Sequence, residues 1–266
     1  MDSALIAAVA AAVFAGAVFQ RLSGIGFSLV AAPALALISG ARSGVALTNL
    51  LAVVVALVVF ATSARRVDRA KALILIPAGL IGVLPGTVLF RLLSPGQLQV
   101  AVGAITALGL TVVLLAPRLR AKARPVSTGC AGLASGFSAA AAGAGGPALT
   151  VYAVATSWPQ PEFVATGQLS YATQGAAALA VKGLPSVSGA WLGVAVPAVV
   201  CGLLAGQLAA RRIDAARARR AAVAIAGLAA LVTLVKGLLS MYGLFSAASA
   251  AAPVCEKAGS MLGTGL

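Results

Sequence analysis

Two glycine-rich turns hold the residues best suited to chemistry in this sequence. Gly24-Ile-Gly26 precedes one apolar run, and Gly143-Ala-Gly145-Gly146 precedes another. Glycine lets backbone N–H groups approach a ligand without a Cβ atom in the way. The short helix that we expect after each turn directs its free N–H groups and the positive end of its dipole at that turn, which favours a bound anion. The turns therefore predict an anion site, against the alternative that these glycines only let helices pack closely.

Polar side chains flank both turns. Arg21 and Ser23 precede the first turn and Ser28 follows it, while Ser138 precedes the second. A guanidinium group suits an oxyanion, because it donates two parallel hydrogen bonds. We expect Arg21 to supply charge to the site, unless its side chain extends to the membrane surface instead. Ser138 is a weaker candidate, because serine often bonds to its own helix backbone.

A second polar group lies within the apolar segments. Thr48 and Asn49 stand near the start of one segment, and Thr166 occupies the corresponding place about 118 residues later. Three polar side chains then follow at three-residue spacing, near one face of a helix: Gln168, Tyr171 and Gln174. A polar face in a membrane helix must contact another helix or a water-filled cavity. We expect this group to line the substrate cavity; simple hydrogen bonding between helices is the alternative.

The composition indicates an integral membrane protein. Hydrophobic residues make up 61% of the 266 residues and charged residues only 9%, whereas a soluble domain carries about 25% charged residues. The net charge of +14 would suggest nucleic-acid binding in a soluble chain. Here the basic residues cluster between apolar runs, as cytoplasmic loops do. We therefore expect a multi-pass protein of the cytoplasmic membrane, surrounded by the lipid bilayer, that binds no nucleic acid.

The sequence contains no enzymatic or metal-binding pattern. The five acidic residues all lie outside the middle of the apolar segments, which argues against a proton relay or a cation site in the membrane. Histidine is absent, the three cysteines lack metal-ligand spacing, and no catalytic triad or P-loop occurs. The sequence therefore predicts no enzyme, no metal and no cofactor.

The chain divides into two halves of five apolar segments each. We expect a first repeat over residues 1–117, a basic linker over 118–125, a second repeat over 126–240 and a tail without an assigned role over 241–266. The segments are Ser3–Gln20, Phe27–Ile38, Val45–Thr62, Ala72–Leu93 and Gln97–Ala116, then Val126–Ala142, Ala148–Ala155, Glu162–Val181, Gly189–Ala210 and Ala221–Leu239. The second segment of each half is shorter than the roughly 20 residues that cross a bilayer. With the glycine turn before it, each predicts a broken or re-entrant hairpin.

The two halves share a plan but are inverted in the membrane. Besides the glycine turns, the stretch 46–49 returns at 164–167, and 82–86 returns at 202–206. Three arginine-rich loops follow the third and fifth segments of the first half and the fourth of the second, and the positive-inside rule places all three in the cytoplasm. Each half must then cross an odd number of times. The sequence therefore predicts an all-α polytopic protein built from two inverted-topology repeats.

These repeated features resemble the TauE/SafE sulfite exporter family of membrane permeases. The resemblance rests on the glycine turn, the apolar run that contains Pro33 and the polar helix start, and it extends from about Ala15 to Val235. It implies transport of sulfite or organosulfonates across the cytoplasmic membrane. The chain departs from the family's usual glycines at Phe27 and Ser28, and Pro147 follows the second turn. These departures bear on the particular substrate more than on the fold.

We therefore expect a secondary transporter of small sulfur-containing anions. It would work by alternating access, with one half moving against the other about a central site. The alternative is a proton- or cation-coupled carrier of another small solute, such as a carboxylate. The sequence leaves open the particular anion, the direction of transport, the coupling ion and whether the chain forms a homo-oligomer.

Overall fold

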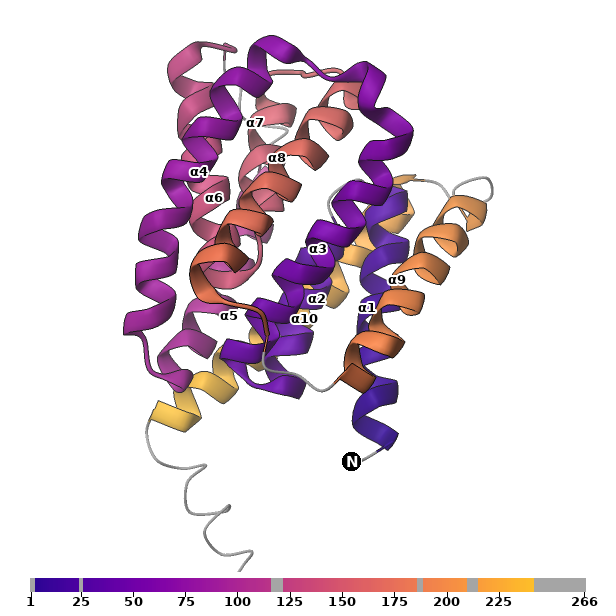
Figure 1. Ribbon diagram of the computed structural model, residues 1–266, viewed down its shortest axis with the longest axis vertical. Coiled ribbons are helices and arrows are strands. Elements are labelled where there is room, and N and C mark those ends of the chain that lie inside the picture. The colour runs from indigo at the N-terminus through magenta and orange to yellow at the C-terminus, as the bar shows by residue number, and fades with distance from the viewer. Residues whose placement is uncertain (1–2, 24–25, 116–121, 186–188, 210–214, 242–266) are drawn as a thin grey trace, which may run out of the picture.

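The protein is a bundle of α-helices, as the sequence predicted. The computed structural model describes residues 3–23, 26–115, 122–185, 189–209 and 215–241, and these ranges contain no strand (Figure 1). In chain order the elements are α1 (Ser3–Ser23), α2 (Gly26–Ser39), α3 (Ala41–Ser63), the short 3-10 helix η1 (Ala64–Arg66), α4 (Arg69–Leu92), α5 (Pro95–Leu115), α6 (Pro125–Ala142), α7 (Gly146–Ala155), α8 (Gln160–Lys182), α9 (Gly189–Ala209) and α10 (Ala215–Met241).

Six of the described helices are long and apolar enough to cross a membrane. They contain the stretches Ala4–Leu22, Ala41–Arg66, Arg69–Leu92, Pro95–Leu115, Trp191–Ala209 and Val223–Met241. Two further apolar helices are shorter, namely Phe27–Ser39 in α2 and Gly146–Ala155 in α7. These are the second segments of the two halves, so the difference in length that the sequence predicted is present in the structure.

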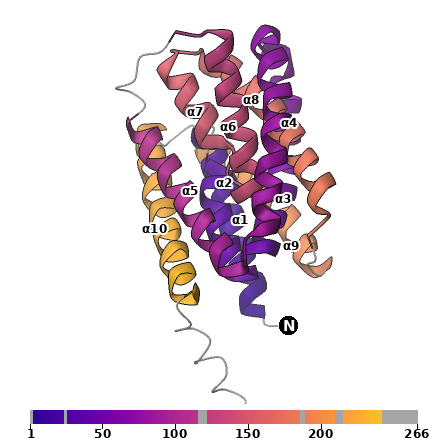
Figure 2. The ribbon, with the colours of Figure 1, turned by 90° about the vertical axis from the view of Figure 1, so that its left-hand side faces the viewer.

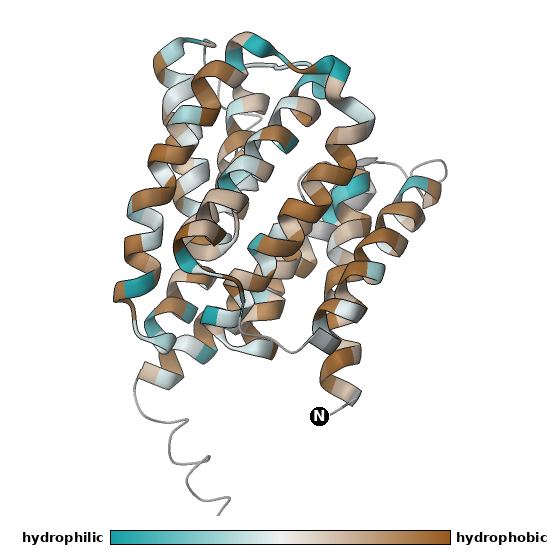
Figure 3. Ribbon diagram, in the orientation of Figure 1, coloured by the Kyte–Doolittle hydropathy of each residue, from teal (hydrophilic) through white to brown (hydrophobic). Residues whose placement is uncertain are grey.

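Large apolar side chains cover the outside of the bundle. Leu73, Leu92, Leu204 and Leu228 each expose between 59% and 77% of their surface, and apolar positions run along the outer faces of the helices (Figure 3). An apolar surface of this extent would be unfavourable in water. It is favourable against lipid tails, so the chain is a multi-pass membrane protein.

Helices from the two halves pack against each other in four pairs. α1 packs on α9, α4 on α6, α3 on α8 and α5 on α10 (Figures 1 and 2). The short helix α2 packs on α1, α3 and α10, and the short helix α7 packs on α5 and α6. Each of the four pairs joins one helix of the first half to one of the second. The halves are therefore interlocked along the whole bundle.

Glycines let the backbones of α4 and α6 touch. A Cβ atom added at Gly136 would lie 1.9 Å from Gly79 O, and one added at Gly82 would lie 2.2 Å from Leu133 O. Neither distance is possible between real atoms, so only glycine fits at these positions. Van der Waals packing of this kind stabilises the pair, because lipid provides no hydrophobic driving force between helices.

The pair α1 and α9 repeats this arrangement. A Cβ atom at Gly202 would lie 2.7 Å from Phe14 O, and one at Gly206 would lie 2.8 Å from Val18 O. Gly82 and Gly202 begin the recurring stretches 82–86 and 202–206 of the sequence. The same short pattern therefore makes the same kind of contact in both halves, with a helix of the opposite half.

Polar contacts tie α4 to α8 at the end of the bundle that carries η1. The Asp68 side chain accepts a hydrogen bond from Lys71 N at 3.1 Å and caps α4, while Asp68 N donates to Thr166 Oγ1 at 3.0 Å. Lys71 forms an ion pair with Asp68 and lies 4.5 Å from the centre of the Trp158 ring. Burial by itself would raise the pKa of Asp68, but the hydrogen bonds and charge of Lys71 bring it below its ordinary value.

The glycine contacts generate a test of the fold. We expect Gly136→Ala to lower the midpoint of thermal unfolding in detergent, because the added methyl group would overpack the α4–α6 contact at a cost of about 1–3 kcal/mol. Gly129→Ala is the matched control on the same helix, since its Cβ would meet only Ile74, at an ordinary 3.9 Å. Equal midpoints for the two variants would contradict this account of the α4–α6 contact.

Candidate functional site

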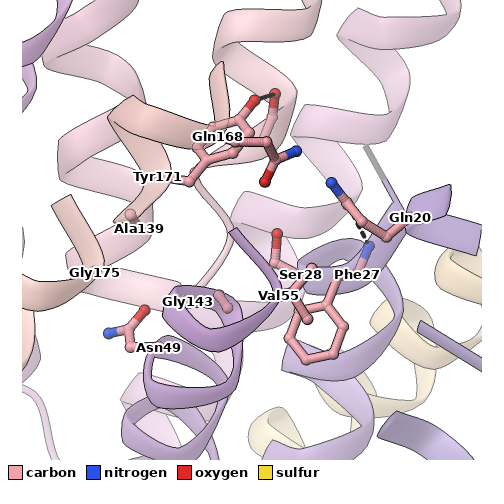
Figure 4. Close-up of a pocket in the computed structure, with 13 residues that line it drawn as sticks. Gln20, Phe27, Ser28, Asn49, Val55, Ala139, Gly143, Gln168, Tyr171 and Gly175 are labelled. Carbon is pink, nitrogen blue, oxygen red and sulfur yellow. Dashed lines mark hydrogen bonds between the residues drawn. The ribbon is translucent and has the colours of Figure 1, made fainter. Parts of the chain in front are cut away.

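The two breaks in the helices meet at a cavity in the middle of the bundle. Its volume is about 40 Å³, which is room for about three water molecules. Its walls come from α1, α2 and α3 of the first half and from α6, α7 and α8 of the second (Figure 4). The lining residues are Gln20, Phe27, Ser28, Asn49, Ala52, Val55, Ala139, Gly143, Gly145, Gly146, Gln168, Tyr171 and Gly175.

At the first break a glutamine side chain caps the start of α2. α1 ends at Ser23 and α2 begins at Gly26. Gln20 is only 7% exposed, and its Oε1 accepts a hydrogen bond from Phe27 N at 3.1 Å (Figure 4). This bond satisfies one of the N–H groups that a helix start leaves without an intrahelical partner. Ser28 lies one residue further along and faces the same cavity.

At the second break α6 ends at Ala142 and is capped by Gly143, whose φ of 72° lies in the left-handed region that glycine adopts without strain. Gly143 N donates to Ala139 O at 2.9 Å, and Ser135 Oγ lies 3.0 Å from Gly145 O. No side chain caps the start of α7. Since Pro147 has no N–H, the free donors at this helix start are backbone groups of its neighbours.

The polar face of α8 is divided between the cavity and a helix contact. Gln168 and Tyr171 line the cavity, and Tyr171 Oη donates to Gly146 O at 3.4 Å. Gln174 is fully buried outside the lining, where its Oε1 lies 2.9 Å from Ser135 Oγ. Gln174 therefore contacts the serine that supports the second turn. Two residues of this face therefore line the cavity, and the third forms a contact between helices.

Asn49 is the polar residue that α3 contributes to the cavity wall. Only one orientation of its amide gives hydrogen-bond partners to both the nitrogen and the oxygen. In that orientation Nδ2 donates to Ala139 O at 3.0 Å and Oδ1 accepts from Lys182 Nζ at 3.1 Å. The neighbouring Thr48 donates to Gly44 O at 2.8 Å. Thr48 is thus bonded within its own helix and is not part of the lining.

The structure brings together part of the set that the sequence proposed. Seven of those residues line the cavity: Ser28, Asn49, Gly143, Gly145, Gly146, Gln168 and Tyr171. Thr48 and Gln174 lie behind them. Gly24 falls outside the described residues, and the structure describes the backbone of Ser23 and Gly26 but not their surroundings.

Three proposed residues make contacts elsewhere. Arg21 donates to Gln207 Oε1 on α9 at 3.1 Å in an exposed contact. Ser138 donates to Ala134 O on its own helix at 2.8 Å. Thr166 accepts from Asp68 N at the end of the bundle near η1. None of the three belongs to the cavity lining, so in this conformation any contribution to substrate binding would act from a distance.

Most of the lining residues that the sequence interpretation missed carry no chemical signal. Phe27, Ala52, Val55, Ala139 and Gly175 are small or apolar, like most of the chain. Gln20 is polar and stands just before the first turn, which is a usable signal. Its role as a cap could not be read, because its partner lies seven residues away across the helix break.

The cavity can bind a small solute through hydrogen bonds. Its wall offers the amides of Gln20, Asn49 and Gln168, the hydroxyls of Ser28 and Tyr171, and the glycine backbone of the second turn. No carboxylate is among the lining residues, and the described part of the chain holds no cluster of residues that could ligate a metal ion. A wall with donors and without negative charge suits a ligand rich in acceptor oxygens.

Comparison with known proteins identifies one family. The family model described as "Sulfite exporter TauE/SafE" matches residues 8–233, which span both glycine turns and reach into α10. The resemblance noted in the sequence is thereby confirmed. No curated protein and no solved structure matched the chain.

The cap at the first break generates a test of this site. We expect Gln20→Leu to lower the thermal stability by about 1–3 kcal/mol, because it leaves the buried N–H of Phe27 without a partner. Gln97→Leu is the control: Gln97 Oε1 accepts from Ser94 N at 2.9 Å at the exposed start of α5, where water can replace the bond. A larger loss of stability for Gln97→Leu than for Gln20→Leu would show that this cap is not a buried constraint.

Proposed function

Since the chain belongs to the TauE/SafE sulfite exporter family of membrane transporters, we propose that it carries a small sulfur-containing anion across the cell membrane. Sulfite, or a sulfonate of similar size, is the substrate class that the family favours. The observation that carries the proposal is the central cavity, in which the helix breaks of both halves meet and whose wall contains no carboxylate. Transport, and not catalysis, is the activity of this family.

The helix contacts support an inverted repeat. α1 packs on α9, and α6, the counterpart of α1, packs on α4, the counterpart of α9. α3 and α5 pack on their own counterparts α8 and α10. A two-fold axis between the halves would produce this set of pairs, and α1 and α6 run in opposite directions along the bundle (Figures 1 and 2). Inverted repeats are the usual basis of alternating access.

The glycine contacts suggest which parts would move together. α1 is joined to α9, and α6 to α4, by backbone contacts that leave no room for sliding. Each of these units carries the helix that leads into one glycine turn. We propose that the two units rock against each other, so that the cavity between the two turns opens first to one side of the membrane and then to the other.

The alternative function is less well supported. A carrier coupled to protons or cations usually holds a carboxylate within the membrane. The two carboxylates among the described residues, Asp68 and Glu162, lie near η1 and at the start of α8, outside the cavity lining.

The proposed function is tested by sulfite flux in proteoliposomes. We expect the wild-type protein to transport sulfite, and sulfite to raise its melting temperature by mass action. Gly145→Leu should abolish flux, because a Cβ at this position already lies 2.9 Å from Ala139 Cβ and a larger side chain would alter the turn. Gly193→Leu is the control, since nothing lies within 4 Å of its Cβ.

The same assay tests two further points. Stabilisation by a carboxylate but not by sulfite, thiosulfate or a sulfonate would contradict the proposed substrate class. Arg21→Ala tests whether Arg21 supplies charge to the site, as the sequence predicts, or only contacts Gln207, as in the structure. Abolished flux would assign the guanidinium group a role in transport, and normal flux would restrict it to the contact with Gln207.

A further inference from the structure

An anion in the cavity needs positive charge nearby, and the wall supplies none. The lining contains amides, hydroxyls and glycine backbone, but no arginine or lysine. A charge that leaves water for a protein interior is strongly destabilised unless an opposite charge or several hydrogen bonds compensate it. Arg21 contacts Gln207 on α9 in an exposed position. Hydrogen bonds from the wall can compensate part of the cost, and any full opposite charge has to come from behind the wall.

Lys182 reaches the back of this wall. It is the last residue of α8, and its Nζ donates to Ala140 O in the final turn of α6. In the orientation of the Asn49 amide that satisfies both of its ends, Nζ also donates to Asn49 Oδ1 at 3.1 Å. The ammonium group also lies 4.2 Å from the centre of the Phe90 ring of α4. Asn49 itself lines the cavity, as does Ala139, the residue before Ala140. One side chain thus separates the ammonium group from the cavity.

The charge of Lys182 has no acidic partner in the described part of the chain. The ion pair found there joins Lys71 to Asp68, close to η1 at the opposite end of α8. The partners of Lys182 are a carbonyl, an amide oxygen and an aromatic ring, which orient the ammonium group without neutralising it. Its field therefore remains available to a ligand in the cavity.

We propose that Lys182 is a positioning residue that supplies the positive charge for the anion in the central cavity. It acts through Asn49, because Lys182 fixes the orientation of the Asn49 amide and places its amino group directly behind it. This inference rests on the proposed function and names the group that makes the cavity selective for negative charge.

A purely structural role is the competing explanation, and the chain contains a matched example of it. Lys236 of α10 donates to Leu37 O in the last turn of α2 at 3.2 Å. Both lysines therefore bond a carbonyl near the end of a neighbouring helix, where the helix dipole favours a cation. Leu37, the hydrogen-bond partner of Lys236, does not line the cavity. If Lys182 only anchored α8 to α6, the two lysines would behave alike.

The test measures KM and the maximal rate for sulfite in proteoliposomes. We expect Lys182→Gln, which keeps a hydrogen-bond donor but loses the charge, to raise KM about tenfold or more. Lys182→Arg should stay within about threefold of the wild-type KM, because it keeps the charge. Lys236→Gln should leave KM unchanged.

Each outcome decides between the explanations. A wild-type KM for Lys182→Gln, with a loss of thermal stability like that of Lys236→Gln, would overturn the inference and leave the proposed function intact. Should Lys182→Gln not assemble, Lys182→Met decides in its place, because it also loses the charge but keeps a long side chain. A wild-type KM for this variant, or a change confined to the maximal rate, would overturn the inference. Absence of sulfite flux and of sulfite-dependent stabilisation in the wild-type protein would overturn the proposed function and the inference together.

Discussion

Where a helix breaks inside a membrane, its free backbone N–H and C=O groups must form hydrogen bonds within the protein. This constraint governs the centre of the structure. A bilayer offers no water to the N–H and C=O groups at a helix break. At the first break the Gln20 side chain accepts from Phe27 N. At the second, Ser135 and Tyr171 lie within hydrogen-bonding distance of the carbonyls of Gly145 and Gly146. The breaks are stable only because helices from both halves surround them, so the cavity and the interlocked fold depend on each other.

Small residues decide how the helices that carry these breaks are held. Lipid tails are as apolar as leucine, so burying leucine between two membrane helices gains little. α4 and α6 instead approach until Gly136 and Gly79 touch through their backbones, and α9 approaches α1 in the same way at Gly202. Contacts of this kind are specific in register, because only positions with glycine permit them. They fix α1 against α9 and α6 against α4.

Two lysines near opposite ends of α8 have different partners. Near η1, Lys71 pairs with Asp68 and stacks on Trp158, which closes the contact between α4 and α8. At the other end of α8, Lys182 bonds carbonyl and amide oxygens of α6 and α3 without an acidic partner among the described residues. A lysine without an acidic partner among the described residues, next to a cavity wall without carboxylates, favours negative solutes over positive ones. This electrostatic preference supports the class of substrate that we propose.

Much of this protein could be read from the sequence, because the relevant signals are local. Apolar runs of sufficient length predict membrane helices wherever they occur, and the short second segment of each half predicted the short helices α2 and α7. Seven of the residues proposed from the sequence, Asn49 and Gln168 among them, line one cavity. Repetition of the same patterns about 119 residues apart gave these weak local signals their weight.

Only the tertiary structure decided which polar group serves which contact. Thr166 is polar, as a site residue would be, but it bonds to Asp68 because α8 places it there. Arg21 likewise bonds to Gln207, which α9 places beside it. Gln20 and Lys182 lie beside Phe27 and Asn49, which the sequence does not mark as their neighbours. Residue type and spacing determine where a helix begins, ends or breaks. The partner of a buried side chain depends on how helices from distant parts of the chain pack, and that is a property of the folded bundle alone.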